Sequence, residues 1–171
     1  MSRRFLIVPA LVVLALVVLV TAAMAAPPQM FVTPLSGDEE VPARDTRAHG
    51  AAIFQLSPDG EELRYRLIAS NIENVVASHI HVGAAGTNGP VVAFLFGPVP
   101  ADGGRRNGVL ATGTITADDL VGPLEGQSMS ALVAELESGN AYVNVHTNDG
   151  EEPPNTGPGD FPGGEIRGQL D

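Results

Sequence analysis

Cysteine, tryptophan and lysine are all missing from the 171 residues of this sequence. Without cysteine, the chain has no disulfide, thiolate metal ligand, cysteine nucleophile or cysteine-held iron–sulfur cluster. All nine positive charges are arginines, against twenty acidic residues, which gives a formal net charge of −11. A surface of this sign repels a polyanion, and no basic stripe offsets it, so we expect no nucleic-acid partner.

Aromatic residues are scarce at 5% of the chain, whereas hydrophobic residues make up 44%. That apolar content is enough for a core of ordinary size, and the length suits one domain. The 20 glycines and 14 prolines indicate many turns, without reaching the composition of a low-complexity chain.

The N-terminus has the three features of a secretory signal peptide. A basic head (MSRR) precedes an apolar run from Phe5 to Val20, and Ala23 and Ala25 form a small-residue A-x-A site. We therefore predict a signal peptide over residues 1–25.

The rest of the chain, residues 26–171, is predicted to be a single mature domain. On this interpretation the protein is secreted, into the extracellular space or the periplasm, and has no membrane attachment after cleavage. The alternative is an uncleaved membrane anchor, against which Pro9 and the A-x-A site argue.

Beyond residue 27 the apolar segments are short, rich in Val and Ile, and separated by Gly, Pro, Asn and Asp, as is typical of antiparallel β structure. One segment, 128–138, has apolar residues at three- and four-residue steps and is predicted to be a short helix. The fold class is therefore all-β, an antiparallel Greek-key β-sandwich or barrel of about eight strands with one short helix. The predicted strands lie near residues 30–35, 49–56, 62–69, 77–82, 91–96, 109–115, 141–147 and 165–170.

Two predicted connections are unusually long. Residues 97–108 are rich in Pro and Gly and contain Arg105 and Arg106. Residues 148–163 carry several acidic side chains, but their spacing does not match a calcium-binding loop. We interpret this second connection as a solvated, mobile acidic loop.

Three of the four histidines fall on the polar faces of predicted strands. Side chains alternate along a strand, so His79 and His81 share one face and lie about 6.6 Å apart at their Cα atoms. His146 has the same facing on another strand. Three neutral imidazoles suit Zn²⁺ or Cu²⁺ and leave one coordination position open. His79, His81 and His146 are therefore candidate metal ligands, with copper or zinc as the candidate cofactor.

Four other polar residues, Asn88, Asn144, Glu165 and Arg167, are candidates for binding or for supporting these histidines. Asn144 or Glu165 could orient an imidazole from behind. The same polar face could instead form a buried network that fixes the strand order without a ligand, or a patch for an organic ligand. His49 opens a strand without an evident partner, and we assign it a structural role.

Four stretches of the sequence together resemble the CHRD domain, named after the repeats of the secreted protein chordin. They read L-S-G-x-x-E-V-P at 35–42, H-I-H-x-G-x-x-G-x-N-G-P-V-V at 79–92, Y-V-N-V-H-T at 142–147 and G-E-I-R-G-Q-L at 164–170. The resemblance spans residues 31–170 and implies a secreted all-β module, present as a single copy. It departs from the usual pattern at 148–162, which is expanded. The partner that the resemblance implies is an extracellular ligand or protein whose identity it does not define.

We expect no enzymatic activity, because no nucleophile–base pair and no paired acids stand out. The pair His79 and His81 is similar to the paired copper ligands of copper–zinc superoxide dismutases, which are also Greek-key barrels. The further histidines and the cysteines of those enzymes are missing, so we do not expect dismutase activity. The leading hypothesis is a secreted, non-enzymatic CHRD-type binding or adhesion module. The alternative is an extracellular copper- or zinc-binding protein that uses the three histidines.

We predict that the exported protein begins at Ala26, because the A-x-A site ends at Ala25. Measurement of the intact mass of the exported protein checks this. A species that retains Met1–Ala25 would contradict signal cleavage and support a membrane anchor.

Overall fold

The computed structural model describes residues 28–170, so the predicted signal peptide lies outside the described residues. Within them, the one α-helix is α1 (Met129–Glu137). The strands are β1 (Met30–Ser36), β2 (His49–Leu56), β3 (Leu63–Glu73), β4 (Val75–Val82), β5 (Val91–Phe96), β6 (Arg105–Ile115), β7 (Ala141–Thr147) and β8 (Ile166–Leu170). Short 3₁₀ helices occupy Gly37–Glu39 (η1), Ala117–Asp119 (η2) and Gly122–Leu124 (η3). The predicted all-β class with one short helix is confirmed.

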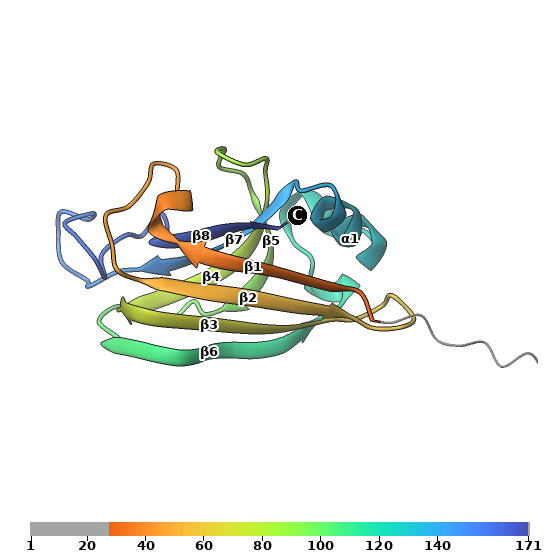
Figure 1. Cartoon of the computed structure of the whole chain (residues 1–171), viewed down its shortest axis with the longest axis horizontal. Coiled ribbons are helices and arrows are strands. Elements are labelled where there is room, and N and C mark those ends of the chain that lie inside the picture. Colours follow the sequence, from red (N-terminus) through yellow and green to blue (C-terminus); the bar gives the residue numbers. More distant parts are fainter. Residues whose placement is uncertain (1–27, 171) are drawn as a thin grey trace, which may run out of the picture.

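The eight strands form one antiparallel sheet in the order β5-β4-β7-β8-β1-β2-β3-β6. The sheet curls until its two end strands approach each other, which makes a nearly closed barrel (Figure 1). The hydroxyl of Tyr65 on β3 donates to the Leu95 carbonyl on β5 at 2.7 Å and so links one end strand to the neighbour of the other, β6. After β5 and β6, the chain returns through α1 to pair β7 with β4, which is a Greek-key connection.

A one-residue corner at Asn74 separates β3 from β4 and sends them to different parts of the sheet. β3 pairs with β2 and β6, whereas β4 pairs with β5 and β7. Asn74 has a φ of +53°, a left-handed conformation that Asn tolerates better than most residues. Its side chain accepts from the Gly104 N–H at 3.1 Å and donates to the Gly159 carbonyl at 3.3 Å. These bonds fix the corner from which β4 starts, the strand that carries His79 and His81.

Two predicted loops differ from the structure. Arg105 and Arg106 are the first residues of β6 and not part of a loop, because β3 extends to Glu73 and pairs with them. The interpretation of 148–163 as fully solvated is wrong at its C-terminal end, where Asp160 and Phe161 are buried. Asp160 accepts hydrogen bonds from the backbone N–H and the hydroxyl of Thr156, which folds the loop back on itself.

The apolar core lies inside the curled sheet, and α1 covers one end of it (Figure 1). Ile80 on β4, Val143 on β7 and Ile166 on β8 are fully buried and point into this core. Leu132 and Leu136 of α1 join them. The alternation predicted for β4 therefore holds, with Ile80 on the core side and the histidines on the other.

We predict that Ile80→Asp lowers the free energy of unfolding by about 4 kcal/mol or more, because it leaves an unpaired charge in the core. His79→Ala should cost about 1 kcal/mol, since His79 is only partly buried and loses one hydrogen bond. Urea denaturation of both variants checks this. Equal and small effects would contradict the placement of the core face.

Candidate functional site

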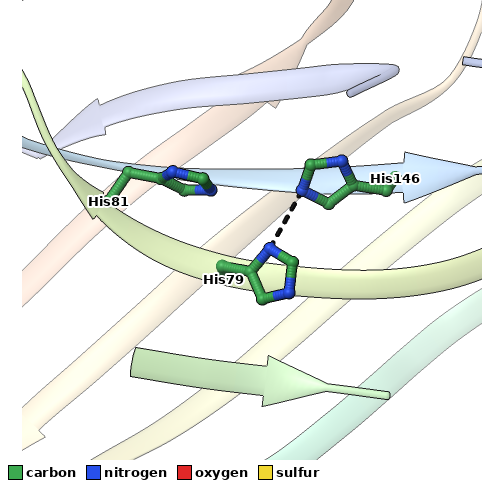
Figure 2. Close-up of side chains that lie close together, drawn as sticks. All are labelled: His79, His81 and His146. Carbon is green, nitrogen blue, oxygen red and sulfur yellow. Dashed lines mark hydrogen bonds between the residues drawn. The ribbon is translucent and has the colours of Figure 1, made fainter. Parts of the chain in front are cut away.

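The three candidate histidines lie together on one side of the β4–β7 pair. In this register His79 lies opposite Asn144, and His146 lies two residues further along β7, opposite Ala77. The candidate ligand atoms of His79, His81 and His146 all fall within 4.8 Å of one another. Figure 2 shows the rings converging, with His79 Nδ1 3.0 Å from His146 Nε2. Strand pairing thus brings together residues that are 65 or more positions apart in sequence.

Backbone carbonyls decide which nitrogen of two rings carries the proton. Nδ1 of His81 lies 2.9 Å from the Gly89 carbonyl, and Nδ1 of His146 lies 2.9 Å from the Pro162 carbonyl. A carbonyl only accepts, so both Nδ1 atoms must be donors, and in a neutral ring Nε2 then keeps its lone pair. His79 Nδ1 accordingly donates to His146 Nε2.

Burial keeps all three imidazoles neutral at neutral pH. It lowers the pKa of His79 to about 4, helped by the nearby His146 and His81 rings. Burial also lowers the pKa of His81 and of His146, although the bonds to the Gly89 and Pro162 carbonyls oppose this. A metal ion binds only a nitrogen without a proton, so His81 Nε2 and His146 Nε2 are already in their ligating form, whereas Nδ1 of His79 still carries its proton.

One nitrogen of the group has nothing to bond. His81 is only 7% exposed, and its Nε2 is buried and has no hydrogen-bond partner among the described residues. A buried acceptor without a donor is costly. A cation at this position, also within reach of His79 Nδ1 and His146 Nε2, would satisfy it.

The polar face behind the histidines is buried as well. Asn144, on β7, is 3% exposed, and its Oδ1 has no hydrogen-bond partner among the described residues. Arg167, on β8, is 1% exposed and donates hydrogen bonds to the loop of residues 83–90, called loop 83–90 below. In this loop its Nη1 donates to Asn88 Oδ1 at 3.4 Å. Asn88 in turn donates to the Val41 carbonyl at 2.8 Å. A polar network of the kind that the sequence suggested as an alternative is therefore present, and it joins Arg167 and loop 83–90 to His81.

The family model of the CHRD domain matches residues 31–154. The chain belongs to the CHRD domain family. The match includes the three histidines, whereas Glu165 and Arg167 lie beyond its end. Neither a curated protein nor a solved structure matches the chain. Within the described part of this CHRD protein, no helix is long and apolar enough to cross a membrane.

The carboxylate of Glu165 bonds groups other than the CHRD histidines. Its carboxylate accepts from the hydroxyls of Thr46 at 2.6 Å and Thr147 at 2.7 Å, and from the Gly159 N–H at 2.9 Å. It thus holds the end of the acidic loop against β7. His49 is exposed on β2, with Nδ1 3.1 Å from the Arg47 carbonyl.

Glu40 is a buried acid of this face that the sequence analysis did not select. It is 5% exposed, and its Oε1 has no hydrogen-bond partner in the described part of the chain. Burial raises the pKa of Glu40 to about 7, although the Val41 backbone and the Arg167 and Arg44 charges oppose this. Asn144 opposes the shift in the pKa of both Glu40 and His81, so its side chain lies near this carboxyl and near the histidines. The one sequence signal for Glu40 was its place in the motif at 35–42.

We predict that Glu40→Gln changes how stability depends on pH. Between the unfolded pKa of 4.5 and the folded pKa of about 7, folded wild-type protein keeps a proton that the unfolded chain releases. The free energy of unfolding of the wild type therefore falls as pH rises through this window. The variant does not show this fall, because glutamine does not titrate.

Urea unfolding of both proteins at about pH 5 and about pH 8 tests this, because the histidines titrate alike in both and cancel in the difference. The stability of Glu40→Gln relative to wild type should increase toward the higher pH. A difference that does not change with pH would contradict a neutral buried carboxyl at Glu40.

Proposed function

We propose that this CHRD domain is a secreted, non-enzymatic module that binds one Cu²⁺ or Zn²⁺ ion through His79, His81 and His146. The observation that carries the proposal is that three imidazole nitrogens lie within 4.8 Å of one another, while His81 Nε2 is buried without a hydrogen-bond partner among the described residues. Neutral imidazoles are ligands that both ions accept.

The surroundings of the histidines support a metal ligand set. In metal sites the second ring nitrogen of a ligating histidine donates to a carbonyl or carboxylate, which fixes the tautomer and the ring orientation. His81 and His146 already make such bonds, to Gly89 and Pro162. The ion would therefore bind His81 Nε2 and His146 Nε2. It would bind His79 Nδ1 in place of the hydrogen bond to His146, once the His79 proton has moved from Nδ1 to Nε2 of the same ring.

The charge and the family of the chain fit an extracellular cation-binding role. CHRD domains are typically extracellular. A net charge of −11 raises the local concentration of cations around the molecule. Three ligands leave a position on the ion for water or for a group of a partner. The proposal assigns binding and no reaction.

A second candidate function is adhesion to an extracellular ligand or protein without a metal. Such a ligand could contact exposed apolar side chains, of which Met30 and Val32 (each 55% exposed) lie on β1 and Val109 (50% exposed) lies on β6. Partner binding that survives chelation and loss of the histidines would identify this function.

We predict that titration calorimetry with Cu²⁺ or Zn²⁺ finds one site per chain. His79→Ala, His81→Ala and His146→Ala should each weaken binding at least about 10-fold, because each removes one of three ligands. His49→Ala is the matched control, since His49 is exposed on another strand and should leave affinity unchanged.

The acidic loop needs a separate control because exposed carboxylates bind cations weakly. Asp149→Asn, Glu151→Gln and Glu152→Gln together remove one half-buried and two exposed charges and leave the Pro162 carbonyl in place. This triple variant should keep the single strong site. The proposal would be contradicted if the three His→Ala changes left the affinity for the ion unchanged, or if the triple variant lost the strong site.

A further inference from the structure

The guanidinium of Arg167 donates hydrogen bonds to loop 83–90 and forms no ion pair with an acid among the described residues. Nη1 donates to the Thr87 carbonyl at 2.9 Å, and Nη2 donates to the Ala84 carbonyl at 3.4 Å and to Gln169 Oε1 at 3.1 Å. The ion pairs found among residues 28–170 involve other arginines. A fully buried cation is thus held mainly by backbone carbonyls of this one loop.

Other side chains hold the same loop. Gln169 donates to the Gly83 carbonyl at 2.9 Å, and the Gly89 N–H donates to the Tyr142 hydroxyl at 3.1 Å. Gly89 also approaches the end of β4 so closely that a Cβ there would collide with the Val82 carbonyl. The loop is therefore fastened near Gly89, whose carbonyl accepts the His81 Nδ1 proton at 2.9 Å.

Arg167 reaches His81 by a second route, through an aromatic ring. Its guanidinium carbon lies 3.4 Å from the centre of the Tyr142 ring. That ring stacks on His81, with centroids 4.7 Å apart and planes 8° from parallel. Since β7 lies between β4 and β8, Tyr142 is held between the two side chains. This stack restricts rotation of the His81 ring.

From these contacts we propose that Arg167 is a positioning residue for the metal site: it fixes the Gly89 carbonyl and the ring of His81, and so keeps the lone pair on His81 Nε2. The inference rests on the proposed function for its consequence in metal binding. Its first part, the tautomer of His81, concerns the metal-free protein. Without the Gly89 acceptor, the His81 proton can move to Nε2, which then cannot bind an ion until the proton leaves.

Lysine cannot replace Arg167 in this role. A guanidinium is planar, so it stacks on Tyr142 while its separate nitrogens reach Thr87 and Ala84. The lysine ammonium is a single compact charge and cannot do both. Arg167→Lys therefore keeps the positive charge but cannot keep both the stacking on Tyr142 and the bonds to Thr87 and Ala84.

The test combines two measurements on full-length mature protein. Nitrogen-15 NMR of the histidine rings reports the tautomer without metal, and calorimetry with Zn²⁺ reports affinity. In wild type, His81 should carry its proton on Nδ1. In Arg167→Lys, part of the population should carry it on Nε2, and Zn²⁺ affinity should fall about 10- to 100-fold.

Milder variants keep the test valid if Arg167→Lys fails to fold. Asn88→Ala removes the loop's bond to Val41 and an acceptor of Arg167 at an exposed position. Tyr142→Phe keeps the ring but removes its bond to Gly89. Both should shift tautomer and affinity in the same direction by a smaller factor. Arg106→Gln is the matched control, because it removes an arginine that lies over Phe96, outside this network.

The outcomes separate the two proposals. If Arg167→Lys shows the same His81 tautomer and the same Zn²⁺ affinity as wild type, the role of Arg167 is overturned and the metal site is unaffected. If Arg167→Lys does not fold, the same result in both milder variants has the same meaning. A shift in Arg106→Gln as large as in Arg167→Lys would also overturn the role of Arg167. Failure of wild type to bind Zn²⁺ would overturn the proposed function, while the NMR result would still decide whether Arg167 fixes the tautomer.

Discussion

The antiparallel pairing of β4 with β7 is the constraint on which the histidine site depends. It brings His146 within hydrogen-bonding distance of His79, although 66 residues separate them in the chain. The buried core fixes this pairing, because Ile80 and Val143 are opposite each other and fully buried. A slip of one residue would turn these side chains outward and the polar face inward. The position of the histidines is therefore a consequence of the hydrophobic core.

Local sequence pattern predicted the strands and the faces well, because alternation and turn residues are local properties. The strand pairings were not predictable in the same way, since β4 meets β7 only through the Greek-key path of the chain. The corner at Asn74 was missed because it has one residue and no proline or glycine. Burial of Glu40 and Asp160 was missed because charged residues usually face solvent. Gly164, far along the chain, lies against Glu40, whereas Asp160 is held by Thr156 of its own loop.

The candidate ligands were predictable as a set, whereas their chemistry was not. Alternation placed His79 and His81 on one face, and the resemblance of the surrounding motifs indicated the family. The choice of nitrogen depends on the Gly89 and Pro162 carbonyls, which belong to irregular segments. Glu165, which the sequence placed beside the histidines, bonds Thr46 and Thr147 instead. Residue type thus led to the proposal of a metal site, and loop geometry determines which nitrogens would bind the ion.

The central claim is that three specified nitrogens converge on one metal position. Crystals of the protein grown with Zn²⁺, with diffraction data collected at the zinc absorption edge, test it most directly. We predict one strong anomalous peak per chain, at about 2.0–2.1 Å from His79 Nδ1, His81 Nε2 and His146 Nε2. A strong peak on the carboxylates of the 148–163 loop with none at the histidines, or coordination through the other ring nitrogens, would contradict the account.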